Sequence, residues 1–389
     1  MSSQLPPQES IASVRARRAH SIKWRRYGPD ILPAWVADMD FPPPQLALEA
    51  GIALLNSGDT GYPSPDLVTN YEAAYRAWAL ENFGTKPNTL RTVADVVAAL
   101  RIIVLATTDP GAGVIVMTPS YPPFFGVVQD AQRHLVSVPM RADGRDYRID
   151  MERLESAATD PNTQAIILCN PQNPTGRVFT GTELTEIANL ADRRGLIVIA
   201  DEIHQDLRGP EVRHIPFSSL EHPSALRAVV LSSPSKSFNI AGLKVAHIEL
   251  PSDPELRARI ESSPLLPLSQ ATPLGLAVGA HAYQSEYGWL VEVRERIDEN
   301  FALVSKGLGD LDCLALYDRE GTYLQWAKIE RLPPDQSAYS FLLEKAHVAV
   351  GPGEDYLPGS TSHFRLNLAA WPSTVEHLIE RMHDALSSI

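Results

Sequence analysis

The stretch Leu196-Ile197-Val198-Ile199-Ala200-Asp201 is an apolar run, rich in β-branched residues, that ends in a carboxylate. Similar short apolar runs are separated by segments with helical spacing, and they lie at residues 114–117, 165–168, 228–231 and 245–250. Short β-branched runs between helices are typical of parallel strands that are buried on both faces. The chain is therefore predicted to be an α/β protein built on a mostly parallel sheet.

The segments around this core suggest three parts. Residues 1–45 are rich in Pro, Arg and Trp without clear periodicity, and they are predicted to form an N-terminal arm that belongs to the small domain. Residues 46–283 are predicted to form a large domain, and residues 284–389 a smaller α+β domain. Helices are expected at 45–57, 67–83, 93–106, 183–194, 284–310, 337–345 and 375–387, and small-domain strands at 323–328, 348–350 and 364–368.

Composition excludes several classes of protein. The chain has 389 residues, of which 44% are hydrophobic and 21% charged, and its net charge is −13. An acidic chain is a poor candidate for binding nucleic acid or an anionic membrane. The two cysteines, Cys169 and Cys313, are too few for a disulfide framework. Residues 1–7 lack the pattern of a leader peptide, and no window approaches the ~20 apolar residues of a membrane helix, so a cytoplasmic location is expected.

Chemically unusual loops follow the predicted strands, and in open α/β sheets ligands bind at the carboxyl ends of strands. Lys236 lies just beyond one strand among small hydroxyl residues, where desolvation would make it a nucleophilic amine, although a surface lysine remains the alternative. Asp201 is a buried carboxylate that needs a cationic partner, which a protonated pyridine nitrogen would supply. An ordinary loop Asp is the alternative for Asp201. A metal site is less favoured, because no second His or Cys group lies at ligand spacing.

Three more residues suggest a ligand with a ring and a carboxylate. Asn173 lies in a rigid Asn-Pro-rich turn and could present its amide to a ligand oxygen. Tyr121, framed by prolines, could stack on a planar ring or simply pack. Arg365 lies in an apolar strand of the small domain, and it could grip a carboxylate with two hydrogen bonds if it faces the interdomain cleft.

A phosphate could bind between two of these loops. Ser233, Ser235 and Lys244 follow the strand at 228–231, and a helix N-terminus is predicted near residue 95. Hydroxyl groups, an ammonium and a helix N-terminus together favour an anion. No glycine-rich phosphate-binding motif occurs in the sequence.

Together these residues resemble the fold-type I pyridoxal-phosphate enzymes, and most closely the MalY/PatB group of cystathionine β-lyases within the aminotransferase superfamily. The resemblance implies a large domain with a mostly parallel seven-stranded sheet, a smaller α+β domain and a homodimer with shared active sites. It is carried, in order along the chain, by residues 35–41, 61–63, 118–124, 169–176, 201–204, 233–244, 321–324 and 365–367.

The resemblance also implies a role for each site residue. Lys236 would be bonded covalently to pyridoxal 5′-phosphate and would later move the Cα proton of the substrate. Asp201 would pair with the ring nitrogen and Tyr121 would stack on the ring, while Asn173 and His204 would lie near the ring hydroxyl. The remaining assignments are Ser233, Lys244, Asp95, Val96 and, from the neighbouring subunit, Tyr62 for the phosphate, and Arg365, Ala37 and Asn173 for the substrate.

One position departs from the family pattern. The family usually has Gly before the helix that receives the phosphate, and this sequence has Asp95. A carboxylate at a helix start gains from the helix dipole and from capping, but it repels a nearby phosphate. We expect Asp95 to turn partly outward and cap the helix, with a residual penalty of ~1 kcal/mol on phosphate binding.

The predicted function is β-elimination from an S-substituted cysteine of the cystathionine type, giving a thiol, pyruvate and ammonia. An aminotransferase would use the same residues, and it would differ by requiring a keto acid. A regulatory binding protein on the same fold is the third alternative. The retention of Lys236, Asp201 and Arg365 argues against a protein that has lost catalysis.

Overall fold

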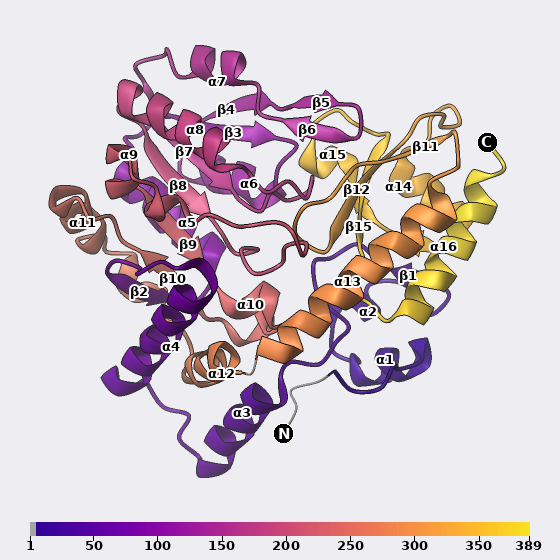
Figure 1. The fold of residues 1–389 in the computed structure, drawn as a ribbon, viewed down its shortest axis with the longest axis horizontal. Helices are drawn as coiled ribbons and strands as arrows, with labels where there is room; N and C mark the ends of the chain where they lie inside the picture. The colour runs from indigo at the N-terminus through magenta and orange to yellow at the C-terminus, as the bar shows by residue number, and fades with distance from the viewer. Residues whose placement is uncertain (1–4, 286) are drawn as a thin grey trace.

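The computed structural model describes residues 5–285 and 287–389. Figure 1 shows a larger α/β body joined to a smaller body that carries the C-terminus. Residues 1–4, on which the prediction about a leader partly rests, lie outside the described residues. Among the residues that are described, no helix has the length and apolar character needed to cross a membrane.

The core of the larger body is a seven-stranded sheet with the order β2-β10-β9-β8-β7-β3-β4. The five strands β4, β3, β7, β8 and β9 run parallel, which confirms the predicted mostly parallel α/β fold. The strands are β2 (Leu90–Val93), β3 (Gly113–Thr118), β4 (His134–Pro139), β7 (Thr163–Cys169), β8 (Ile197–Asp201), β9 (Val229–Ser232) and β10 (Ala246–Glu249), and a separate hairpin is formed by β5 (Arg141–Asp143) and β6 (Asp146–Arg148).

Three strands of the seven-stranded sheet differ from the prediction. The run at 245–250 forms β10, but β10 is antiparallel to both of its neighbours, so its interpretation as a parallel strand is wrong. The segment between β9 and β10 contains only the four-residue α10 (Pro234–Ser237) and a short 3₁₀ turn, which are too short to form the crossover helix that parallel strands need. The prediction also missed β2 and β4. Most β4 side chains are exposed or half-buried, so this edge strand lacks a continuous apolar run.

Helices cover both faces of the sheet because side chains alternate along each strand. Val114 and Val116 of β3 pack in one cluster with α5, α6 and α11, whereas Ile115 and Met117 pack in another with α7 and α8. The helices of the larger body are α3 (Gln45–Ser57), α4 (Pro65–Phe83), α5 (Val96–Thr107), α6 (Pro122–Asp130), α7 (Met151–Ala157), α8 (Gly181–Arg194), α9 (Pro223–Leu226), α10 (Pro234–Ser237), α11 (Pro254–Glu261) and α12 (Pro273–Gln284).

The smaller body is built on an antiparallel sheet with the order β11-β12-β15-β14. The N-terminal arm joins it through β1 (Leu32–Pro33), which pairs with β13 (Val348–Ala349). The other elements of this body are α1 (Ile11–Arg17), α2 (Ile22–Arg25), α13 (Tyr287–Leu308), β11 (Leu314–Leu316), β12 (Leu324–Ile329), α14 (Ala338–Phe341), β14 (Gly351–Pro352), α15 (Gly353–Tyr356), β15 (His363–Asn367) and α16 (Pro372–Leu386).

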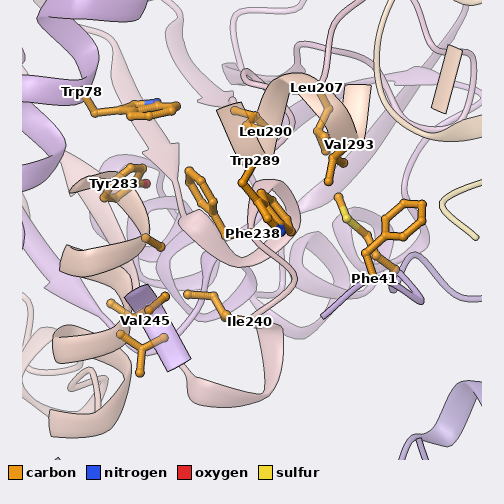
Figure 2. Packing of buried hydrophobic residues seen from close by; sticks show 14 of the residues in the cluster. Phe41, Trp78, Leu207, Phe238, Ile240, Val245, Tyr283, Trp289, Leu290 and Val293 are labelled. Atoms are coloured by element: carbon orange, nitrogen blue, oxygen red, sulfur yellow. The ribbon is translucent and has the colours of Figure 1, made fainter. Parts of the chain in front are cut away.

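An aromatic cluster fixes the turn that carries Lys236. Figure 2 shows Phe238 between Tyr283 and Trp289. The ring centroids of Phe238 and Trp289 lie 5.9 Å apart in a stacked arrangement, and those of Phe238 and Tyr283 lie 5.7 Å apart edge to face. Because Phe238 directly follows α10, this packing holds α10 between α12 and α13.

Candidate active site

A cavity of about 360 Å³ opens beyond the carboxyl ends of β3, β7, β8 and β9. This edge of the sheet is where ligands bind in open α/β folds. Eleven of the thirteen residues predicted for the site line the cavity, and they are Ala37, Asp95, Val96, Tyr121, Asn173, Asp201, His204, Ser233, Ser235, Lys236 and Lys244. Arg365 and Tyr62 lie outside this lining and are described separately below.

Lys236 projects from α10 toward the N-terminal arm. Its Nζ donates a hydrogen bond of 2.7 Å to the carbonyl oxygen of Ala37. Burial and the positive charge of Arg365 lower the pKa of Lys236 to about 8, although the carboxylates of Asp38 and Asp201 act in the opposite direction. A lysine with this pKa carries a substantial neutral fraction near neutral pH, which is what a nucleophilic or basic amine requires.

Asp201 is the last residue of β8 and is 3% exposed. Burial raises the pKa of its carboxyl to about 7, although the backbone N–H of Ile203 donates a hydrogen bond of 3.1 Å to it. No ion pair to Asp201 is formed by the described residues. A buried carboxylate in this state would be stabilised in its ionised form by a cationic group in the cavity.

His204 and Tyr121 face the same cavity from different loops. His204 is 2% exposed, and its Nδ1 has no hydrogen-bond partner among the described residues. Burial and the charges of Lys236 and Arg365 lower the pKa of His204 well below its usual range, so its imidazole is neutral. Burial raises the pKa of the Tyr121 phenol to about 12, so that side chain is neutral as well. Both residues are therefore uncharged polar groups that suit a ring hydroxyl or a ring face.

Arg365 is held against Asn173 and the arm. Its Nη1 donates to Asn173 Oδ1 and its Nη2 to the carbonyl oxygen of Trp35, both at 2.9 Å. The guanidinium also lies over the ring of Tyr356, 4.7 Å from the centroid. Arg365 Nε is buried and has no partner among the described residues, so the side chain retains a donor for an additional anion. The prediction that Arg365 faces the cleft between the two bodies therefore agrees with its contacts.

A second part of the lining, called the phosphate end below, consists of Ser233, Ser235 and Lys244, together with Asp95 at the start of α5. Ser233 Oγ donates to the carbonyl oxygen of Val245 at 2.7 Å and accepts from the backbone N–H of Ser235. Asp95 accepts a hydrogen bond of 2.8 Å from the backbone N–H of Ala98, which confirms the predicted helix cap. Its other oxygen lies 3.0 Å from Lys244 Nζ, a contact that the sequence did not predict.

Tyr62 lies away from this cavity. Its side chain is 95% exposed, and it borders a separate depression with Pro63, Thr92 and Gln270. Within one chain the structure therefore does not bring Tyr62 to the other predicted residues.

Three residues that matter to the site were not predicted. Ile203 lines the cavity from the turn that follows β8, and its place directly before His204 in the loop beyond that strand could have identified it. Asn367 donates from Nδ2 to the carbonyl oxygens of Val36 and Asp38, both at 2.7 Å, and so fixes the arm over the site. Asp206 accepts from Ser237 Oγ at 2.8 Å and thereby anchors α10. No sequence signal identifies these two tertiary contacts.

The sequence relationship covers nearly the whole chain. Residues 36–382 match the family of class I and II aminotransferases. The chain belongs to this family. Cystathionine β-lyase PatB from Bacillus subtilis (strain 168) is 35% identical to it over 94% of this chain and 97% of the relative.

Solved structures share the fold over nearly the same length. The crystal structure of cystalysin from Treponema denticola, which contains pyridoxal 5′-phosphate, has a TM-score of 0.91 and 29% identity, and the match covers all of both chains. N-succinyldiaminopimelate aminotransferase from Mycobacterium tuberculosis has a TM-score of 0.83 and 26% identity, and 96% of each chain is covered. The fold is therefore that of fold-type I transferases.

The two ends of the cavity fit pyridoxal phosphate differently. Asp201, which lacks a cationic partner among the described residues, and His204, with its unpartnered Nδ1, fit a protonated pyridine ring with polar substituents. The other end offers Lys244 and the start of α5 to a phosphate, but both already bind Asp95. No group of three or more potential metal ligands occurs among the described residues.

Proposed function

We propose that this chain is a pyridoxal-phosphate-dependent C–S β-lyase that converts an S-substituted cysteine of the cystathionine type into a thiol, pyruvate and ammonia. The observation that carries the proposal is the convergence of Lys236, Asp201 and Asn173 on one cavity, with Arg365 hydrogen-bonded to Asn173 beside it. The 35% identity to a cystathionine β-lyase supports this choice of reaction.

Protein groups suited to each part of the cofactor surround the cavity. Asp201 would pair with the protonated ring nitrogen, and Tyr121 would pack on a face of the ring. The neutral His204 and the amide of Asn173 would hold the ring hydroxyl. When bound, pyridoxal phosphate supplies an electron sink that makes the Cα proton of an amino acid removable.

The substrate would be oriented by its α-carboxylate. Arg365 presents its buried Nε, and its other nitrogens are fixed by Asn173 and Trp35, so the guanidinium is held in place before the substrate arrives. A preorganised guanidinium binds a carboxylate with directional, charge-assisted hydrogen bonds. The substrate is therefore expected to enter with its carboxylate toward the small body and its Cα toward Lys236.

Lys236 would act as the base that takes the Cα proton. Its pKa of about 8 lies close to neutral pH, where a general base is most effective. The Ala37 carbonyl oxygen accepts a hydrogen bond from Nζ and so fixes the direction of the amine. Loss of the Cα proton drives cleavage of the Cβ–S bond, with the electron pair leaving on sulfur. Hydrolysis of the remaining three-carbon fragment gives pyruvate and ammonia.

An aminotransferase is the alternative within the same family, and the similarity to N-succinyldiaminopimelate aminotransferase is the observation that favours it. The two reactions differ in their co-substrate. We expect cystathionine and other S-substituted cysteines to release equal amounts of thiol and pyruvate without added keto acid. The Lys236→Ala variant serves as the inactive control. Amino-group transfer that occurs only with added keto acid, without release of thiol, would establish the aminotransferase instead. Absence of both activities would favour the regulatory binding protein.

We further propose that the protein acts as a homodimer in which Tyr62 of one subunit reaches the phosphate end of the other. Tyr62 is almost fully exposed, and exposed apolar side chains gather along α3, namely Leu46, Leu48, Ile52 and Leu55. Exposed apolar groups of this kind mark protein–protein contacts. Light scattering should give about twice the chain mass of 42.7 kDa.

The division into an arm and small domain (1–45 and 284–389) and a large domain (46–283) belongs to this proposal, as does a cytoplasmic location. The pairing of β1 with β13 supports grouping the arm with the small domain. Cys169 and Cys313 are both unpaired, which suits a reducing compartment. Fractionation of cells that express the protein at its natural level would test the location.

A further inference from the structure

Asp95 occupies the phosphate end of the cavity with both of its carboxylate oxygens engaged. Oδ1 accepts a hydrogen bond of 2.8 Å from the backbone N–H of Ala98, in the first turn of α5. Oδ2 lies 3.0 Å from Nζ of Lys244, which comes from a distant part of the chain. One side chain thus joins the start of α5 to the ammonium that faces it.

The two partners of Asp95, the start of α5 and Lys244, are groups that would also bind a phosphate. The N-terminus of a helix binds anions through its free N–H groups and its dipole, and α5 is long enough, at 12 residues, to offer both. Lys244 is the only lysine besides Lys236 that lines the described cavity. The hydroxyl of Ser233 is engaged within the chain, with the carbonyl oxygen of Val245 and the hydroxyl of Ser235. Two of the anion-binding groups at this end, the ammonium of Lys244 and the N–H of Ala98, are therefore already partnered by Asp95.

Asp95 is charged in this arrangement. Burial acts to raise the pKa of its carboxyl, but the hydrogen bonds from Ala98 and Lys244 outweigh burial and lower the pKa below its usual value. The side chains of Lys244 and Asp95 are 55% and 37% exposed, respectively. The pair is therefore screened by water, and both side chains have room to change rotamer.

We propose that Asp95 competes with the phosphate of the cofactor for Lys244 and for the N-terminus of α5, so that the cofactor binds by displacing a carboxylate of the protein. The proposal rests on the proposed function, because that function supplies the phosphate. This competition lowers the affinity for pyridoxal phosphate below the value that the site would have without the Asp95 carboxylate. The competition weakens the binding of the phosphate group and leaves the binding of the ring unchanged.

The test compares two ligands that differ only in the phosphate. Pyridoxal phosphate and pyridoxal are titrated into cofactor-free protein, and binding is followed by quenching of tryptophan fluorescence. Asp95→Asn is the main variant, because Asn retains the helix cap and removes the charge. Asp253→Asn is the matched control, since Asp253 caps α11 in the same way and does not line the cavity.

We expect Asp95→Asn to bind pyridoxal phosphate about five- to tenfold more tightly than wild type, which corresponds to about 1 kcal/mol. Pyridoxal should bind both proteins equally, and Asp253→Asn should match wild type for both ligands. Asp95→Gly, which also lacks the charge, should reproduce the gain. An unchanged or lower affinity of Asp95→Asn for pyridoxal phosphate would overturn the proposal, as would an equal gain for pyridoxal.

Inorganic phosphate separates this proposal from the proposed function. Calorimetric titration of inorganic phosphate tests Asp95 without the ring, and Asp95→Asn should again bind several-fold more tightly than wild type. If wild type bound inorganic phosphate with the expected dependence on Asp95 but never bonded the cofactor to Lys236, the proposed function would fail and the competition would stand. If Asp95→Asn bound inorganic phosphate no better than wild type, the competition would fail.

Discussion

The two ends of the cavity differ in whether their polar groups already have partners within the protein. At the ring end, formed by Asp201 and His204 with Arg365 close beside the lining, buried polar groups retain unmet hydrogen-bonding or charge requirements. At the phosphate end, Asp95 and Lys244 satisfy each other. The ring end therefore depends on a ligand to complete it, whereas at the phosphate end the ligand has to replace an interaction of the protein.

The two ends also differ in burial, and burial sets how much free energy a substitution costs. Arg365 is 3% exposed and His204 2%, so a lost partner there leaves a group that water cannot reach. Asp95 and Lys244 are far more exposed, so water and salt moderate any change in their pairing. Substitutions at the ring end are therefore expected to have large effects, and those at the phosphate end small ones.

The largest effect is expected for Lys236→Ala. Removal of the amine eliminates both the covalent attachment of the cofactor and the base, and general-base catalysis alone contributes roughly 10²- to 10⁴-fold. We expect the absorbance of the Lys236-bound cofactor to disappear and turnover to fall by at least about a thousandfold. Lys306→Ala, which lies on α13 outside the cavity, serves as the control. Turnover at the wild-type rate in Lys236→Ala would refute the assignment.

Arg365→Ala tests the substrate side of the ring end. Without the guanidinium the α-carboxylate is poorly paired, which should cost about 2–5 kcal/mol in kcat/KM, or roughly 30- to several-thousand-fold. Absorbance of the bound cofactor should persist, because Arg365 is assigned to the substrate. Arg145→Ala, at an exposed ion pair with Asp318, is the control. A variant that lost the cofactor but kept wild-type kcat/KM after reconstitution would contradict the assignment.

Asp201→Asn tests whether the ring end carries an unmet charge. The folded-state pKa of about 7 lies above the ordinary value of 3.8, so between these pH values the folded protein holds a proton that the unfolded chain has released. Cofactor-free wild type should therefore lose stability as pH rises from about 4 to about 7, by an amount of the order of 4 kcal/mol. The Asn variant lacks this loss.

The Tm advantage of Asp201→Asn over wild type should therefore grow from pH 4 to pH 7 and stay constant above it, as measured by calorimetry on cofactor-free protein. Added pyridoxal phosphate should reduce the advantage, because its ring nitrogen would pair with the ionised Asp201. Asp318→Asn, at an exposed carboxylate, should show no such trend. An advantage that shrank with rising pH would mean that Asp201 already has a cationic partner.

The parts of the fold that were predicted from the sequence are those in which burial leaves a local pattern. Apolar runs followed by polar residues predicted β7, β8 and β9 and the loops beyond them, because burial on both faces leaves a strong local pattern. Asp201 ends β8 and His204 lies in the loop just beyond it, so both were found from that strand end. The edge strand β4 left no such pattern, and the direction of β10 depends on the turns that precede it.

Contacts between distant segments were beyond prediction. Asp95 was predicted as a helix cap because capping is local, but its contact with Lys244 joins residues 149 positions apart. The role of Asn367 has the same origin, because its amide binds an arm more than 300 residues away in the chain. Local sequence patterns thus identified the residues of the site, whereas their contacts with distant segments are seen only in the folded chain.

The smallest effect concerns the fold at the phosphate end. Asn at position 95 can still accept the hydrogen bond from Ala98, so Asp95→Asn should change Tm by no more than about 1 °C, whereas Asp95→Ala should lose about 1 kcal/mol with the cap. Asp253→Ala should lose a similar amount, because its cap on Leu256 has the same geometry. If Asp95→Asn were as unstable as Asp95→Ala, the charge and its bond to Lys244 would stabilise the fold itself. Equal stability of Asp95→Asn and wild type, together with tighter phosphate binding, would show that the capping role of Asp95 and its competition with the cofactor are separable.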